Sequence, residues 1–294
     1  MWIDNCVMAV ASYLPRSVKS VARRWLFSKS HPAHIGLRGV GVVQDLYYWV
    51  ADGTLDTFLP VENYFSVFYP LLDTSTVGTI TVFDGQGLEI GRKKFELAHL
   101  GSCKMRISHI LQEFGGERRL GITFGTLICD IAVPASVRQV IDVAQPFYFW
   151  DRFYIGYLSR AGQPTFVHGV DKTFISRADR QGFNRWYPYA RTYRWAPEIP
   201  INIADYEKFT IVVTNRVARS AHFRLLLEDT SDQYREWDAV IRPNGVARFE
   251  LTTANTAGLN PCELRMRLEG MPTQWGRPLV FKEFASGAIS AMHC

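Results

Sequence analysis

The residues of this chain whose types and spacing best suit chemistry begin at His168. Asp171 and Lys172 follow it closely, so the imidazole and the carboxylate could meet across a turn. An imidazole oriented by a carboxylate can act as a general acid or base. A structural interpretation is stronger, in which Asp171 caps the turn and His168 bonds a backbone carbonyl. We therefore treat His168, Asp171 and Lys172 as weak catalytic candidates.

A second group of residues suits binding rather than catalysis, because arginines alternate there with aromatic side chains. Guanidinium groups beside aromatic faces suit sugar rings, nucleobases, phosphates or a protein partner. The local sequence offers little acid beyond Asp179, so we expect the arginines to face solvent in a groove or to pair with distant carboxylates. The candidate ligand-binding residues are Arg185, Trp186, Tyr187, Arg191, Arg194 and Trp195.

Several classes of site are disfavoured by the residues present. The five cysteines are widely spaced without a C-x-x-C pair, and the histidines are scattered, so we predict no metal site. No glycine-rich phosphate loop follows a strand, and we expect no cofactor. The net charge of +5 is modest, and no specific nucleic-acid binding is expected. Unpaired cysteines are typical of a reducing compartment, which predicts a cytoplasmic protein.

The N-terminal residues resemble an amphipathic helix. Leu14, Val18, Val21, Trp25 and Leu26 recur at three- and four-residue steps up to Lys29. This helix either docks on the body of the protein or makes a weak peripheral membrane contact through residues 7–29. No stretch approaches the ~18–20 apolar residues that a membrane-spanning helix needs.

Short apolar runs separated by turn signals dominate the rest of the chain, which is typical of β-sandwiches. Asp52-Gly53 and Asn244-Gly245 are examples of such turns, and Pro134 marks a boundary. We predict an N-terminal helix and linker (residues 1–35), a first sandwich (36–135) and a second sandwich (136–294) that carries the aromatic and basic insertion (about 145–200).

The two predicted sandwiches show a faint repeat at a spacing of roughly 144 residues. The fold we expect is therefore all-β, with two tandem immunoglobulin-like β-sandwiches related by internal duplication, and with Asp84 and Asp229 at equivalent turns. The matched segments are Phe65–Tyr69 with Phe209–Val213, Thr79–Asp84 with Phe223–Asp229, Lys104–Ile107 with Val246–Phe249, and Thr126–Cys129 with Pro278–Phe281.

Three functions remain open on these observations. The first is a non-enzymatic binding or adaptor protein whose second sandwich presents its aromatic and arginine-rich surface to a ligand or protein partner. The second is an enzyme that acts on a polar, anionic or sugar-like substrate in a cleft between the sandwiches, using His168 and Asp171. The third is a peripheral membrane or assembly component.

Overall fold

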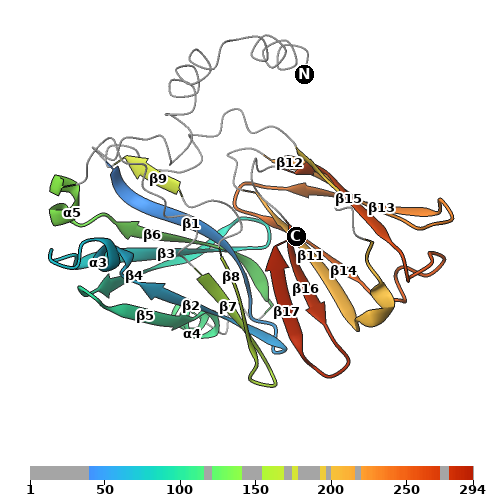
Figure 1. Cartoon of the computed structure of the whole chain (residues 1–294), viewed down its shortest axis with the longest axis horizontal. Coiled ribbons are helices and arrows are strands. Elements are labelled where there is room, and N and C mark those ends of the chain that lie inside the picture. Colours follow the sequence, from blue (N-terminus) through green and yellow to red (C-terminus); the bar gives the residue numbers. More distant parts are fainter. Residues whose placement is uncertain are drawn as a thin grey trace, which may run out of the picture.

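The computed structural model describes residues 40–115, 121–140, 154–168, 174–177, 193–196, 200–215, 220–271 and 278–293. The predicted N-terminal helix lies outside these residues. The described part is mostly β-structure, arranged in four antiparallel sheets that form two bodies side by side (Figure 1). None of its helices is long and apolar enough to cross a bilayer.

The first sandwich packs the sheet β4-β3-β6-β1-β9 against the sheet β5-β2-β7-β8. Val43, Ile80 and Leu127 of one sheet share a core with Leu59 and Ile155 of the other. The strands are β1 (Val40–Val50), β2 (Leu55–Glu62), β3 (Thr76–Asp84), β4 (Glu89–Leu97), β5 (Ser102–Arg106), β6 (Phe124–Ala132), β7 (Tyr154–Ser159), β8 (Pro164–His168) and β9 (Phe174–Arg177). Three short helices, α3 (Tyr64–Phe68), α4 (Ile107–Glu113) and α5 (Ala135–Val140), connect them.

The predicted boundary at residue 135 needs correction, because the chain returns to the first sandwich after α5. β7 pairs with β2, β8 pairs with β7, and β9 pairs with β1. The two sequence-distant strands pack closely at Gly156 of β7, where a Cβ would lie 2.2 Å from the ring of Phe58 on β2. Most described strands of the predicted insertion therefore complete the first sandwich, and only β10 (Tyr193–Trp195) joins the second.

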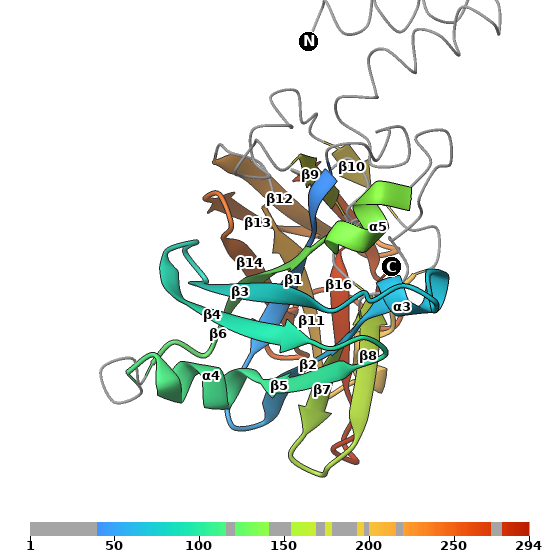
Figure 2. The ribbon, with the colours of Figure 1, turned by 90° about the vertical axis from the view of Figure 1, so that its left-hand side faces the viewer.

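The second sandwich consists of the sheets β10-β15-β12-β13 and β14-β11-β16-β17. Its core contains Phe209, Phe223, Leu225, Leu268 and Val280, all almost fully buried. The remaining strands are β11 (Lys208–Thr214), β12 (Ala221–Glu228), β13 (Tyr234–Ile241), β14 (Val246–Leu251), β15 (Arg265–Met271), β16 (Leu279–Glu283) and β17 (Ile289–His293), and a short 3-10 helix, η4 (Ile203–Asp205), precedes β11. Figure 2 shows this sandwich lying behind the first.

The two sandwiches have the same order of strands. The neighbours β4-β3-β6-β1 correspond to β13-β12-β15-β10, and β5-β2-β7-β8 correspond to β14-β11-β16-β17. In this order the first two strands of each unit lie in different sheets. The immunoglobulin arrangement instead keeps its first two strands, A and B, together in one sheet. The immunoglobulin-like topology expected from the sequence is therefore not the one that the described strands form.

This strand order agrees with only part of the sequence repeat. Thr79–Asp84 and Phe223–Asp229 fall on the corresponding strands β3 and β12, and Lys104–Ile107 and Val246–Phe249 fall on β5 and β14. Phe65–Tyr69 was matched with β11, but it forms helix α3. Thr126–Cys129 lies in β6, whose counterpart is β15 rather than β16. Two of the four matches are therefore wrong.

Asp84 and Asp229 occupy turns with the same hydrogen bonds. Each carboxylate Oδ1 accepts from the backbone N–H groups two and four residues later, at 2.8–3.0 Å. The residue three positions later has a left-handed backbone, at Gly87 (φ 80°) and Asp232 (φ 59°). This is a type I turn followed by a bulge, a usual three-residue hairpin.

Candidate functional site

The contact between the two sandwiches, called the junction below, has an apolar centre. β11 is buried at every residue from Phe209 to Thr214, so both of its faces are covered. Phe209 and Ile211 belong to the core of the second sandwich, while Val212 belongs to the core of the first. Phe281 of β16 also joins the first core. We call β14-β11-β16-β17 the packed sheet.

Phe281 packs against two tyrosines of the first sandwich. Its ring centroid lies 5.7 Å from that of Tyr48 and 4.8 Å from that of Tyr157. The hydroxyl of Tyr157 donates a hydrogen bond of 2.9 Å to the carbonyl oxygen of Tyr48. Burial raises the pKa of both phenols, so both stay neutral. Tyr48 and Tyr157 therefore act as apolar surface at the junction.

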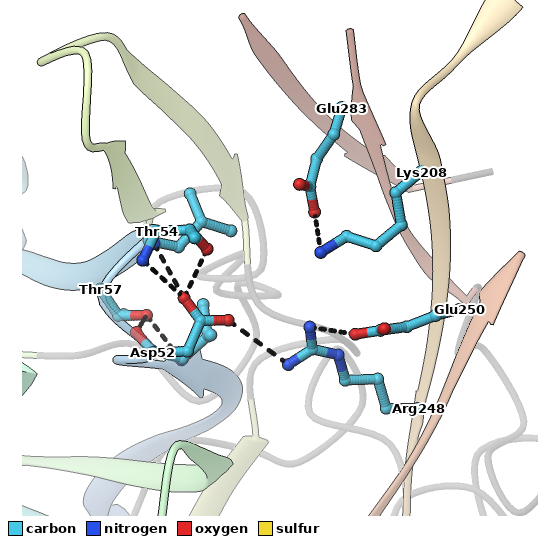
Figure 3. Close-up of polar contacts among 9 residues, drawn as sticks. Asp52, Thr54, Thr57, Lys208, Arg248, Glu250 and Glu283 are labelled. Carbon is cyan, nitrogen blue, oxygen red and sulfur yellow. Dashed lines mark hydrogen bonds and ion pairs between the residues drawn. The ribbon is translucent and has the colours of Figure 1, made fainter. Parts of the chain in front are cut away.

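Charged side chains line one margin of the junction (Figure 3). Arg248 of β14 pairs with Glu250 on its own strand, and its Nη1 lies 3.7 Å from Oδ2 of Asp52 in the first sandwich. The guanidinium also lies 5.4 Å from the ring centroid of Phe124. Nearby, Lys208 and Glu283 form an ion pair of 2.7 Å. The side chains of Asp52 and Arg248 are mostly buried, which limits screening of their attraction by solvent.

Asp52 is held in place by the turn between β1 and β2. Its Oδ1 accepts hydrogen bonds from the backbone N–H and the hydroxyl of Thr54 and from the N–H of Leu55, at 2.6–3.0 Å. Burial alone would raise the pKa of Asp52, but these hydrogen bonds and the nearby Arg248 lower it. A carboxylate fixed as an anion opposite a guanidinium suits the joining of two bodies better than it suits proton transfer.

The structure places His168 at the junction, at the end of β8. Its side chain is exposed, and its carbonyl oxygen accepts a hydrogen bond of 2.9 Å from Nε2 of His293 in β17. The two imidazole rings are stacked with centroids 4.4 Å apart. Asp171 and Lys172 lie outside the described residues, so the predicted pairing of His168 with Asp171 stays a prediction.

The candidate ligand-binding residues lie mostly outside the described part of the chain. This is the case for Arg185, Trp186, Tyr187 and Arg191. Arg194 and Trp195 lie on β10, whose backbone pairs with β15 at the edge of the second sandwich. We call the sheet β10-β15-β12-β13 the free sheet. The segment that carries these residues thus enters the free sheet at its β10 edge.

The opposite edge of the free sheet borders a groove that the sequence did not reveal. It has a volume of about 720 Å³ and lies between β13 and the loop that joins β14 to β15. We call it the edge groove. Its lining residues are Gln233, Tyr234, Arg235, Glu236, Trp237, Ala254, Asn255, Gly258 and Leu259. The two walls are distant in sequence, and the exposed aromatic Tyr234 on an edge strand was the one available signal.

Known proteins offer little further guidance. No protein-family model matches the chain, and no curated protein matches it. Among solved structures, a proposed β-galactosidase from Bacteroides fragilis shares 13% identity at a TM-score of 0.22, and a β-glucuronidase from Bacteroides uniformis shares 11% at 0.18. The matches cover 90% of this chain but only 34% and 27% of those chains. Likenesses this weak define neither a fold nor an activity.

Proposed function

We propose that this chain is a non-enzymatic binding or adaptor protein whose second sandwich presents the free sheet and its two edges to a protein partner. The observation that carries the proposal is that the two sheets of that sandwich differ in burial. The packed sheet is buried on both faces, whereas the free sheet is not. A rigid scaffold that carries variable loops and edges is the usual arrangement of a binding protein.

The outer face of the free sheet supports a binding role for that sheet. Arg224 of β12 lies 2.8 Å from Glu236 and 3.4 Å from Asp238, both on β13, and Arg267 and Glu269 of β15 pair at 3.1 Å. These partly exposed side chains form a mixed-charge surface, which suits contact with solvent or with a partner. The aromatic and arginine-rich segment meets this sheet at β10, and the edge groove follows β13.

The enzymatic alternative has less support. The described side chains between the sandwiches make a packed contact, centred on Phe281, Tyr48 and Tyr157. His168 lies beside this contact and stacks on His293. A role for His168 and Asp171, a peripheral membrane role for residues 7–29 and a cytoplasmic location all stay predictions.

Affinity capture with a matched variant tests the proposed function. The full chain and an Arg185→Ala/Arg191→Ala/Trp195→Ala variant are immobilised, and the captured proteins are compared quantitatively. The control is Arg92→Ala/Lys94→Ala, which changes exposed cations of the first sandwich. We expect the first variant to lose specific partners that the control retains, with little change in melting temperature. An unchanged set of partners, or a melting temperature lowered by several degrees, would assign the segment to the scaffold instead.

We also propose that the two sandwiches arose by duplication of one ancestral unit. The support is the shared order of eight strands and the shared turns at Asp84 and Asp229. Superposition of the two units in a crystal structure of the chain provides the check. Strands β2–β8 are expected to superpose on β11–β17 in sequence order, and failure of the β6–β15 pair to overlay would contradict a common origin.

A further inference from the structure

The lining residues of the edge groove indicate that it follows the edge of a strand. Five consecutive residues, Gln233 to Trp237, line one wall. Successive side chains of a strand point to opposite faces of its sheet, so neither face alone can expose five in a row. The groove therefore runs along the backbone of β13, which is an outermost strand of its sheet.

The hydrogen-bond register shows which backbone groups face this groove. The N–H of Asp229 donates to the carbonyl of Gln233 at 2.9 Å, so residue 233 bonds inward, toward β12. Antiparallel pairs alternate between bonded and non-bonded positions. Residues 235 and 237 therefore also bond to β12, whereas Tyr234 and Glu236 direct their N–H and C=O groups toward the groove. These are donors and acceptors at the spacing that another extended chain requires.

The facing wall is a loop already fixed by hydrogen bonds. Asn255 accepts from the N–H of Thr252 at 2.8 Å through its side-chain oxygen, and the hydroxyl of Thr256 donates to the carbonyl of Thr252 at 2.8 Å. Arg235 of β13 donates to the carbonyl of Ala257, which ties the loop to the strand. A site held this way exists before a ligand arrives, which lowers the entropy cost of binding.

The chemistry of the groove indicates the side chains of its ligand. Glu236 is paired with Arg224, and Arg235 is bonded to the loop, so the charges at the groove already have partners. Trp237 is half-buried and supplies apolar surface on the side of the loop, whereas Leu259 is buried and the lining as a whole is mostly polar. A ligand that directs an apolar side chain toward Trp237 and carries otherwise uncharged side chains matches this surface better than a strongly charged one.

We propose that the edge groove binds an extended peptide of a partner protein, which adds to the free sheet as a strand beside β13. This inference rests on the proposed binding function and names the form of its partner. Main-chain hydrogen bonds to Tyr234 and Glu236 supply affinity, and the contact with Trp237 selects an apolar residue at the peptide position that faces it.

Selection from a phage-displayed library of random dodecapeptides on the immobilised full chain provides the probe. The best peptide is synthesised with a fluorescent label, and its affinity is measured by anisotropy. Glu236→Pro removes an N–H that faces the groove, and Val240→Pro removes an N–H on the same edge beyond the groove. Proline is tolerated at such edge positions because the lost N–H does not bond within the sheet. We expect Glu236→Pro to weaken binding about tenfold and Val240→Pro less than twofold.

N-methylated versions of the peptide test the same bonds without altering the protein. Methylation of the backbone nitrogens at every second residue is expected to abolish binding when those N–H groups face β13. Methylation of the alternate set of nitrogens is expected to leave binding intact. Peptides that tolerate both Glu236→Pro and methylation in either register would overturn strand addition. If such peptides are instead lost with the Arg191→Ala/Trp195→Ala variant, the binding function stands and its site is the β10 segment. If no peptide is enriched, the proposed ligand is wrong, whereas the partner capture still tests the binding function.

Discussion

The guanidinium of Arg248 and the carboxylate of Asp52 lie 3.7 Å apart and join β14 of the second sandwich to the first turn of the first sandwich. The guanidinium also covers the ring of Phe124. The two residues therefore fix the relative position of the sandwiches at the margin of an apolar contact.

Replacing Arg248 is expected to destabilise the protein. Arg248→Ala leaves Asp52 as a largely buried anion without its guanidinium and removes the contact with Phe124. We expect a loss of about 2 kcal/mol in the free energy of unfolding, measured in urea. The matched control is Arg92→Ala, since Arg92 pairs with Glu89 on an exposed surface and such a pair contributes ~0–1 kcal/mol. Equal losses from both variants would show that the junction pair has no special role.

The apolar centre of the junction is expected to couple the unfolding of the two sandwiches. Phe281 belongs to β16 but packs in the core of the first sandwich, so its removal affects both bodies. We expect one calorimetric transition for the unaltered chain. For Phe281→Ala we expect a loss of about 3–5 kcal/mol or a split into two transitions. Two transitions already present in the unaltered chain would contradict this coupling.

Two glycines occupy the same position of two hairpin turns, and only one of them contacts the other sandwich. Replacing each with alanine therefore distinguishes the cost of backbone strain from the cost of disturbing that contact. Gly87 (φ 80°) and Gly162 (φ 81°) both have left-handed backbones. A Cβ at Gly87 would lie 2.1 Å from the carbonyl oxygen of Pro243 in the second sandwich, whereas a Cβ at Gly162 would meet open space. We expect Gly162→Ala to cost about 1 kcal/mol and Gly87→Ala clearly more, measured by urea unfolding. Similar costs would mean that the turn of Gly87 is not pressed against Pro243.

A partly buried carboxyl in the first sandwich makes stability depend on pH. Asp130 of β6 accepts a hydrogen bond of 2.6 Å from Nε2 of Gln44 on β1. Burial raises the pKa of Asp130 to about 6, although the bond from Gln44 works in the opposite direction. At pH values between these two pKa values, the folded protein keeps a proton on Asp130 that the unfolded chain, with a pKa of ~3.9, has already released.

The sign of the effect follows from this difference in bound protons. Between pH 4 and pH 6 the folded state binds more protons, so the contribution of Asp130 to stability falls as the pH rises, by up to about 2–3 kcal/mol. Asp130→Asn keeps an acceptor for Gln44 but carries no charge. We expect this variant to gain stability relative to the unaltered chain at pH 7 but not at pH 4, in urea titrations at both values. A gain of equal size at both pH values would contradict the raised pKa.

Turn residues and short apolar runs predicted more of the fold than the repeat between distant segments did. The turn signals Asp52-Gly53 and Asn244-Gly245 fall between strands as predicted, and the aspartates at 84 and 229 identified two equivalent hairpins. The repeat failed at Phe65–Tyr69, because a short apolar run fits a helix turn as well as a strand. The return of β7 and β8 to the first sandwich could not be predicted, since strand pairing depends on partners distant in sequence.

The candidate site was less predictable for a similar reason. The edge groove combines an edge strand with a loop that follows the next strand, and composition does not indicate that they face each other. The consecutive apolar residues Ile211, Val212 and Val213 of β11 did carry a signal, because adjacent strand residues point to opposite faces and apolar residues on both faces indicate burial on both. It indicates that a second body covers the packed sheet, as Val212 and Phe281 do by joining the first core.

Hydrogen–deuterium exchange of the full chain, with and without a captured partner, measures most directly which surface the partner covers. We predict slower exchange at residues 185–195, along Gln233–Trp237 and in the loop at 252–259, and unchanged exchange in the strands of the first sandwich. Slower exchange confined to the first sandwich or to the junction around Phe281 would contradict a binding role for the free sheet.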